Sequence, residues 1–173
     1  VRSAQQRTAA MSEDYDKELI YKSVDDLLFV FQKEVEAVAG KCIVVAGEDE
    51  CCSILSEMSL QRNWQYFFTN DRHLHEMLEN RGISVSSDEN DFEQMQVAIT
   101  PCESLVARTG SVLMSSVPAQ GRRLYAFAPV HIVVATEDQL VGFPEDALHK
   151  FQSRYSSQLP SSFGFVTGPS RTA

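Results

Sequence analysis

The sequence predicts an α/β fold in three layers, with a mostly parallel sheet and helices on both faces of that sheet. Between residues 41 and 85, short apolar runs alternate with segments whose apolar residues recur at helical spacing. This order is typical of βαβ units with parallel strands. A length of 173 residues suits one such domain with a substantial core. Because the sequence contains no internal repeat and no low-complexity linker, we expect a single domain over residues 13–173, preceded by a flexible arm at residues 1–12.

The first half is expected to alternate helices with strands. Ser23 is a suitable N-cap, and apolar residues then recur at helical spacing up to Gly40, which predicts a first helix between them. The following boundaries come from apolar runs, acidic first turns and glycine stops. The predicted elements are a buried strand at 41–46, a helix at 48–58, a strand at 64–69, a helix from 70–71 to 81, and a brief strand at 83–85.

The second half is expected to complete the sheet. Pro101 stops a β-branched apolar run, and Pro129 opens another. The predicted elements are strands at 97–100, 111–114, 130–135 and 163–166, about one and a half helical turns at 103–108, a polar loop through 121–123, and a helix at 144–155. The chain stops at Ala173, where a further helix should begin, so we expect the C-terminal end to be truncated or disordered.

Charge and hydropathy exclude several classes of protein. Residues 1–96 carry 9 Lys and Arg against 19 Asp and Glu, a net charge of −10, whereas residues 97–173 carry 6 against 5. An acidic chain is a poor candidate for binding nucleic acid or an anionic membrane. No apolar run approaches the roughly 20 residues of a membrane span, and the first residues lack the apolar segment of a signal peptide. A cytoplasmic location is therefore expected.

Cysteines and histidines give no sign of a metal or cofactor. The four cysteines (Cys42, Cys51, Cys52 and Cys102) have neither a C-x-x-C pair nor a zinc or iron–sulfur spacing. Cys102 follows a strand and a proline, but no histidine is near it in sequence, which disfavours a catalytic thiol. His73 and His75 stand two residues apart and cannot share an ion on a helix. We expect no metal and no cofactor.

Two glycine-containing turns suggest a site for a small anion. Each turn follows a strand and combines glycine, hydroxyl residues and arginine, which supply backbone N–H groups and bidentate donors. We expect the two turns to meet at one rim. The candidate ligand-binding residues are Arg108, Thr109, Gly110, Ser111, Arg122, Arg123, His131, Thr167, Gly168, Ser170 and Arg171. Surface arginines and a plain strand–turn ending remain alternatives, and His131 is either a hydrogen-bonded structural group or a general acid/base.

The same segments resemble a known family. VAITPCESLVARTGSVLMSS, GRRLYAFAPVHIVVA and GFVTGPSRTA are similar to the LUD domain of the lactate-utilisation protein C family (LutC/YkgG-like). The resemblance is good over residues 96–173, and the first half agrees in the order of its helices and strands. The most specific pieces are Pro129-Val130-His131-Ile132 and the TGPSRTA ending at 167–173.

The resemblance implies a fold similar to ribose-5-phosphate isomerases and CoA transferases (NagB/RpiA/CoA-transferase-like). It also implies a role in oxidising L-lactate to pyruvate beside iron–sulfur or flavin-linked partner proteins. The family usually has a glutamate where this chain has Arg108. A guanidinium stays protonated and is a poor nucleophile, which disfavours covalent acyl transfer and favours anion binding. Glu103 is interpreted as a solvated residue at the start of a helix.

Three hypotheses follow. The first is a non-redox component of lactate oxidation that binds a small anionic metabolite. The second is an isomerase- or transferase-like enzyme acting on a phosphorylated or CoA-linked metabolite, with His131 as the acid/base. The third is a structural partner that docks an iron–sulfur oxidoreductase through its acidic half. The sequence does not decide whether the chain is itself an enzyme.

Overall fold

The fold contains two sheets, and the first of them is parallel and has four strands. The computed structural model describes residues 26–117, 121–156 and 158–169. The sheet has the order β2-β1-β3-β6, and every neighbouring pair is parallel. Its strands are β1 (Phe67–Phe68), β2 (Val85–Ser86), β3 (Val97–Thr100) and β6 (Val130–Val133). In register, Phe67 lies opposite Val97, which in turn lies opposite Val130. The α/β class predicted from the sequence is confirmed.

Helices cover both faces of this sheet. Successive side chains of the central strand β3 point to opposite faces, so each face packs on different helices. Val97 and Ile99 pack with side chains from α3 (Glu48–Arg62) and α4 (Arg72–Glu79). Ala98 packs with Leu124 of α5 (Gly121–Phe127) on the other face. All three β3 residues are fully buried, as expected for a parallel strand covered on both sides.

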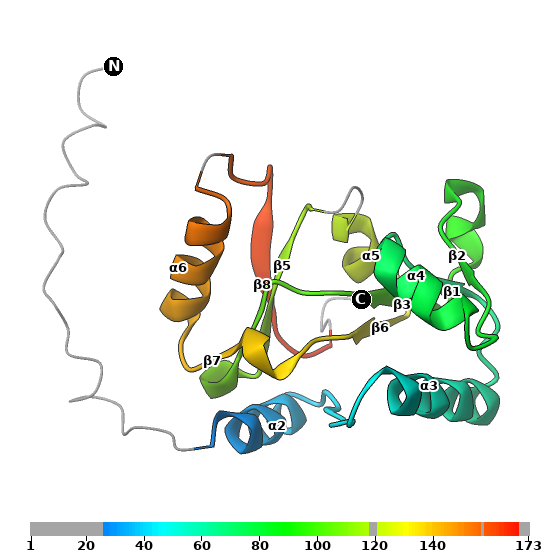
Figure 1. The fold of residues 1–173 in the computed structure, drawn as a ribbon, viewed down its shortest axis with the longest axis horizontal. Helices are drawn as coiled ribbons and strands as arrows, with labels where there is room; N and C mark the ends of the chain where they lie inside the picture. Colours follow the sequence, from blue (N-terminus) through cyan, green and yellow to red (C-terminus); the bar gives the residue numbers. More distant parts are fainter. Residues whose placement is uncertain (1–25, 118–120, 157, 170–173) are drawn as a thin grey trace, which may run out of the picture.

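A second, mixed sheet was not anticipated from the sequence. Its order is β7-β4-β5-β8, with antiparallel pairing of β4 to β5 and of β5 to β8, and parallel pairing of β4 to β7. Its strands are β4 (Ser104–Val106), β5 (Ser111–Ser115), β7 (Leu140–Val141) and β8 (Phe163–Val166). One face packs on α6 (Pro144–Arg154), mainly through Ala147 and Phe151. Figure 1 shows α6 beside this sheet, and α2 (Leu27–Ala37) below β7.

Two predicted elements are wrong. The predicted strand at 41–46 is not a strand, and Ile43 and Val44 are 41% and 53% exposed. The run has the composition of a buried strand, but neither sheet of the described structure includes it. The predicted helical turns at 103–108 are instead strand β4 followed by a 3₁₀ turn, Ala107–Thr109. β4 pairs with β5 on one edge and with β7 on the other, and these partners hold the segment extended.

Other boundaries shift by a few residues. The first helix has Asp26 as its N-cap, which accepts a hydrogen bond from the Phe29 N–H at 2.9 Å. The loop predicted at 121–123 is also wrong, because these residues begin the helix α5. The predictions for residues 1–12, Ser23 and 170–173 fall outside the described residues. In the part of the chain that is described, no helix is both long and apolar enough to cross a membrane.

Candidate functional site

A cavity of about 290 Å³ opens at the carboxyl ends of β1 and β3. After β1 the chain passes through α4 to β2 on one side, whereas after β3 it proceeds to β6 on the other side. Adjacent parallel strands whose connections diverge in this way leave a crevice beyond their carboxyl ends, where α/β proteins bind ligands. Residues 69–71 after β1 and 100–103 at the end of β3 line this crevice.

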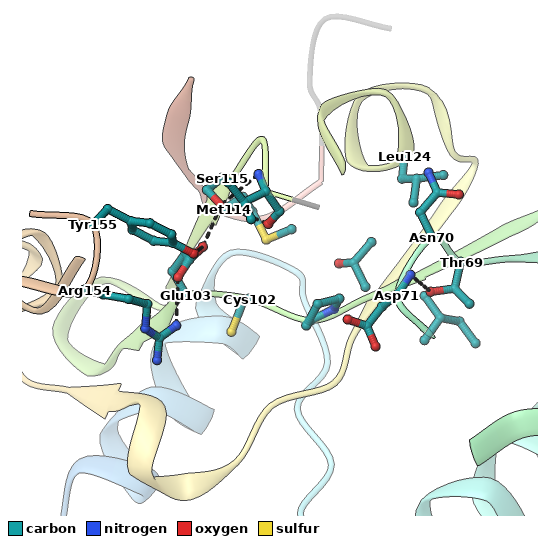
Figure 2. Close-up of a pocket in the computed structure, with 14 residues that line it drawn as sticks. Thr69, Asn70, Asp71, Cys102, Glu103, Met114, Ser115, Leu124, Arg154 and Tyr155 are labelled. Atoms are coloured by element: carbon teal, nitrogen blue, oxygen red, sulfur yellow. Dashed lines mark hydrogen bonds and ion pairs between the residues drawn. The ribbon is translucent and has the colours of Figure 1, made fainter. Parts of the chain in front are cut away.

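The walls of the cavity come from both sheets. One side is built from β1 and α5, and the other from the segment after β3 together with β5 and the end of α6. Figure 2 shows Thr69, Asn70, Asp71 and Leu124 on one side, and Glu103, Ser115, Arg154 and Tyr155 on the other. The second sheet therefore has a role in the site, because it carries polar groups to the open ends of the parallel strands.

Glu103 is a buried cavity residue with three side-chain partners. It is only 8% exposed, yet both of its carboxylate oxygens have partners. Oε1 accepts from the Ser115 hydroxyl at 2.6 Å and from the Tyr155 hydroxyl at 3.0 Å, and Oε2 accepts from Arg154 Nη1 at 2.9 Å. A buried carboxylate is tolerated when such donors and an opposite charge compensate the lost hydration. The interpretation of Glu103 as a solvated helix residue is wrong.

Burial alters the acid–base chemistry of the neighbouring groups. Burial, and then the hydrogen bond to Glu103, raise the pKa of Tyr155, so its hydroxyl remains a proton donor. Burial and the negative charge of Glu103 raise the pKa of Cys102 to about 12. The reactive form of cysteine is the thiolate, which makes the neutral Cys102 thiol a poor nucleophile near pH 7.

His131 reaches the cavity through a hydroxyl group. Its Nε2 lies 2.8 Å from Thr100 Oγ1, and Thr100 lines the cavity. Burial lowers the pKa of His131 to about 4, which leaves the imidazole neutral at physiological pH. A neutral imidazole has one donor and one acceptor nitrogen, so it can orient the Thr100 hydroxyl without adding charge to the site.

The two predicted glycine turns do come together, and both contact α2. The Ser111 and Thr167 hydroxyls are 2.6 Å apart. Gly110 has a φ of +59°, and a Cβ there would lie 2.7 Å from backbone atoms of α2. Gly168 has a φ of +64°, and its Cβ would lie 2.6 Å from the carbonyl oxygen of Val38 at the end of α2. The close approach of a helix accounts for both glycines; ligand binding at these turns stays a prediction.

The predicted arginines lie in different places. The Arg108 guanidinium lies over the Phe143 ring, 4.6 Å from its centroid. That of Arg123 lies 4.4 Å from the centroid of Phe92, on the side of the molecule that carries α5. Thr109 is exposed at its turn. Ser170, Arg171 and the side chain of Arg122 fall outside the described residues. Their role as ligands stays a prediction.

The sequence interpretation missed Thr69, Asp71, Glu103, Arg154 and Tyr155 as cavity residues. The available signal was positional, since 69–71 directly follow one apolar strand and 103 lies shortly after another. Within the described residues, no group of three or more His, Cys, Asp and Glu side chains could hold a metal ion. His73 instead lies 3.1 Å from a Glu48 oxygen on the surface.

The structure is that of an α/β protein with a cavity at the carboxyl ends of its parallel strands. The LUD domain family model matches residues 28–173, and the chain belongs to this family. Its fold is similar to the crystal structure of a DUF162 family protein from Deinococcus radiodurans, with a TM-score of 0.64 and 17% identity over 82% of this chain and 87% of that one. The comparison with curated proteins found no match.

Proposed function

We propose that this chain is a lactate-utilisation protein C-like component of L-lactate oxidation, which binds a small anionic metabolite and carries out no redox step itself. Membership of the LUD domain family supports a role related to lactate utilisation. The observation that carries the binding role is the cavity at the divergence of β1 and β3, where Arg154 supplies a cation. Iron–sulfur or flavin-linked proteins perform the electron transfer in this proposal.

Growth of a deletion strain tests the role in the cell. Deleting the gene should impair growth on L-lactate and leave growth on pyruvate unchanged, because only the oxidation step is lost. Re-expression of the wild-type chain should restore growth. Purified protein alone should not reduce an artificial electron acceptor when L-lactate is added. Normal growth of the deletion strain on L-lactate would contradict the proposal.

A second function is favoured by the contact between His131 and Thr100. A neutral imidazole 2.8 Å from a hydroxyl that lines a cavity has the arrangement of an acid/base pair. This arrangement supports an isomerase- or transferase-like enzyme acting on a phosphorylated or CoA-linked metabolite. A thermal-shift screen of sugar phosphates, CoA esters and hydroxy acids separates the two functions. Stabilisation by the phosphorylated or CoA-linked compounds alone would favour the enzyme.

A further inference from the structure

The two sides of the cavity offer opposite hydrogen-bonding chemistry. On one side, the Arg154 guanidinium is a donor, whereas the Tyr155 hydroxyl gives its one proton to Glu103 and has none left to donate. On the other side, Asp71 is an acceptor, and the buried Thr69 hydroxyl accepts a hydrogen bond from the Asp71 N–H at 3.2 Å. Figure 2 shows Arg154 and Tyr155 on one side, and Thr69 and Asp71 on the other. A ligand that satisfies both sides must carry a negative group at one end and a donor at the other.

Glu103 holds Arg154 at the wall of the cavity. Arg154 is 53% exposed, and a side chain of this length would otherwise adopt many rotamers. Its Nη1 bond to Glu103 uses one of five guanidinium N–H donors. The Glu103 oxygens are already engaged by Ser115 and Tyr155 as well. Glu103 is therefore a positioning residue, and the remaining donors of Arg154 are the groups available to a ligand.

Asp71 has one oxygen committed to the fold. Its Oδ1 accepts from the Leu74 N–H at 2.9 Å and caps α4. Asparagine is as good an N-cap as aspartate, so Asp71→Asn preserves this bond while it removes the negative charge. The cavity is also lined by the apolar side chains of Ile99, Pro101 and Met114, beside the hydroxyl groups of Thr100 and Ser115. The apolar part suits a short carbon skeleton.

We propose that the cavity binds a short carboxylic acid with a hydroxyl or ammonium donor, its carboxylate held by Arg154 and its donor by Asp71. This assignment rests on the proposed function for the presence of a small anion, and it adds the chemical class of that anion. Bidentate geometry makes arginine the cation suited to a carboxylate. The half-buried Asp71 favours ligands that can donate a hydrogen bond, because its carboxylate can only accept one.

Calorimetric titration of the whole chain with matched acids tests the proposal. The probes are L-lactate, 4-hydroxybutyrate and 4-aminobutyrate, each with a donor, and propionate and butyrate, which lack one. The wild type should bind at least one donor-bearing acid about 10-fold more tightly than its donor-free counterpart, as expected for one charge-assisted hydrogen bond. Failure of the wild type to bind any of these acids, or equal affinity within each matched pair, would overturn the assignment.

Three variants locate the two ends of the ligand. Arg154→Gln should weaken binding of every acid about 10- to 100-fold. Asp71→Asn should reduce the preference for donor-bearing acids while butyrate binding is kept, and Glu103→Gln should weaken binding without changing this preference. Arg72→Gln is the control, because Arg72 is 92% exposed and pairs with Glu76. Circular dichroism checks that each variant is folded, and unchanged affinity in folded Arg154→Gln would overturn the assignment.

The outcomes separate this inference from the proposed function. A lactate growth defect in the deletion strain, together with no acid binding by the pure chain, leaves the cellular role and removes the ligand class. Normal growth on lactate, together with binding that depends on Arg154 and Asp71, would remove the cellular role and leave the ligand class.

Discussion

Replacing Gly110 with alanine tests how closely the turn before β5 approaches α2. Gly110 has a φ of +59°, in the left-handed region, and a Cβ at this position would lie 2.7 Å from both Glu34 C and Val35 N. These are backbone atoms in the middle of a helix, so they cannot move aside as a flexible side chain would. The turn or the whole of α2 must shift.

Two costs determine the size of the effect. A residue with a Cβ in the left-handed region costs about 1–2 kcal/mol. Overpacking against a fixed neighbour adds about 1–3 kcal/mol. Gly110→Ala should therefore lower the free energy of unfolding by about 2–5 kcal/mol. For a chain of this size, that loss corresponds to a fall in Tm of roughly 4–20 °C.

Urea unfolding followed by circular dichroism measures this loss, and Gly82→Ala is the matched control. Gly82 has a φ of +76°, but a Cβ there would meet no described atom within 4 Å. Gly82→Ala should lower the free energy of unfolding only by the cost of a left-handed backbone, about 1–2 kcal/mol. The entropy change of the unfolded chain is common to both variants and cancels in the comparison. Equal losses in the two variants would refute the close packing of the turn on α2.

Three further predictions concern the cavity. Glu103→Gln should lower the free energy of unfolding by about 1–2 kcal/mol, whereas Glu76→Gln on the surface should leave the urea midpoint unchanged; equal effects would contradict the buried network. Burial lowers the pKa of His131 to about 4, so the fold favours its neutral form, and the free energy of unfolding should fall by about 3 kcal/mol as pH falls from 6.5 to 4. His131→Gln should remove this pH dependence, and an NMR titration of His131 near pH 6.5 would contradict the prediction. Iodoacetamide at pH 8 should label half-buried Cys42 before buried Cys102, and mass spectrometry showing the reverse order would contradict the burial of Cys102.

The parts of the fold that the sequence predicted correctly depend on local signals. The apolar run at 97–100 and its proline stop define β3, and the proline start with acidic residues predicts α6. The run at 41–46 has the same composition as a buried strand, but strand formation also needs a partner, and neither sheet of the described structure includes this run. The segment 103–108 is too short for its composition to distinguish a strand from a helix.

The candidate site was hidden because its bonds connect distant parts of the chain. The partners of Glu103 lie 12, 51 and 52 residues further along, on β5 and at the end of α6. Only the formation of the second sheet brings them together. A helix was expected to start at 70–71, and Asp71 is its N-cap in the structure. Its place in the cavity follows from the pairing of β1 with β3, which no local pattern specifies.

Backbone amide chemical shifts during titration with a donor-bearing acid test the central claim most directly. We expect the largest changes at residues 69–71, 100, 102 and 103, which line the cavity between the two strand ends. The amides of Gly110 and Gly168 should change little, because α2 packs against both. Changes confined to Gly110 and Gly168, with the strand ends unaffected, would contradict binding in the cavity and place the ligand at the glycine turns.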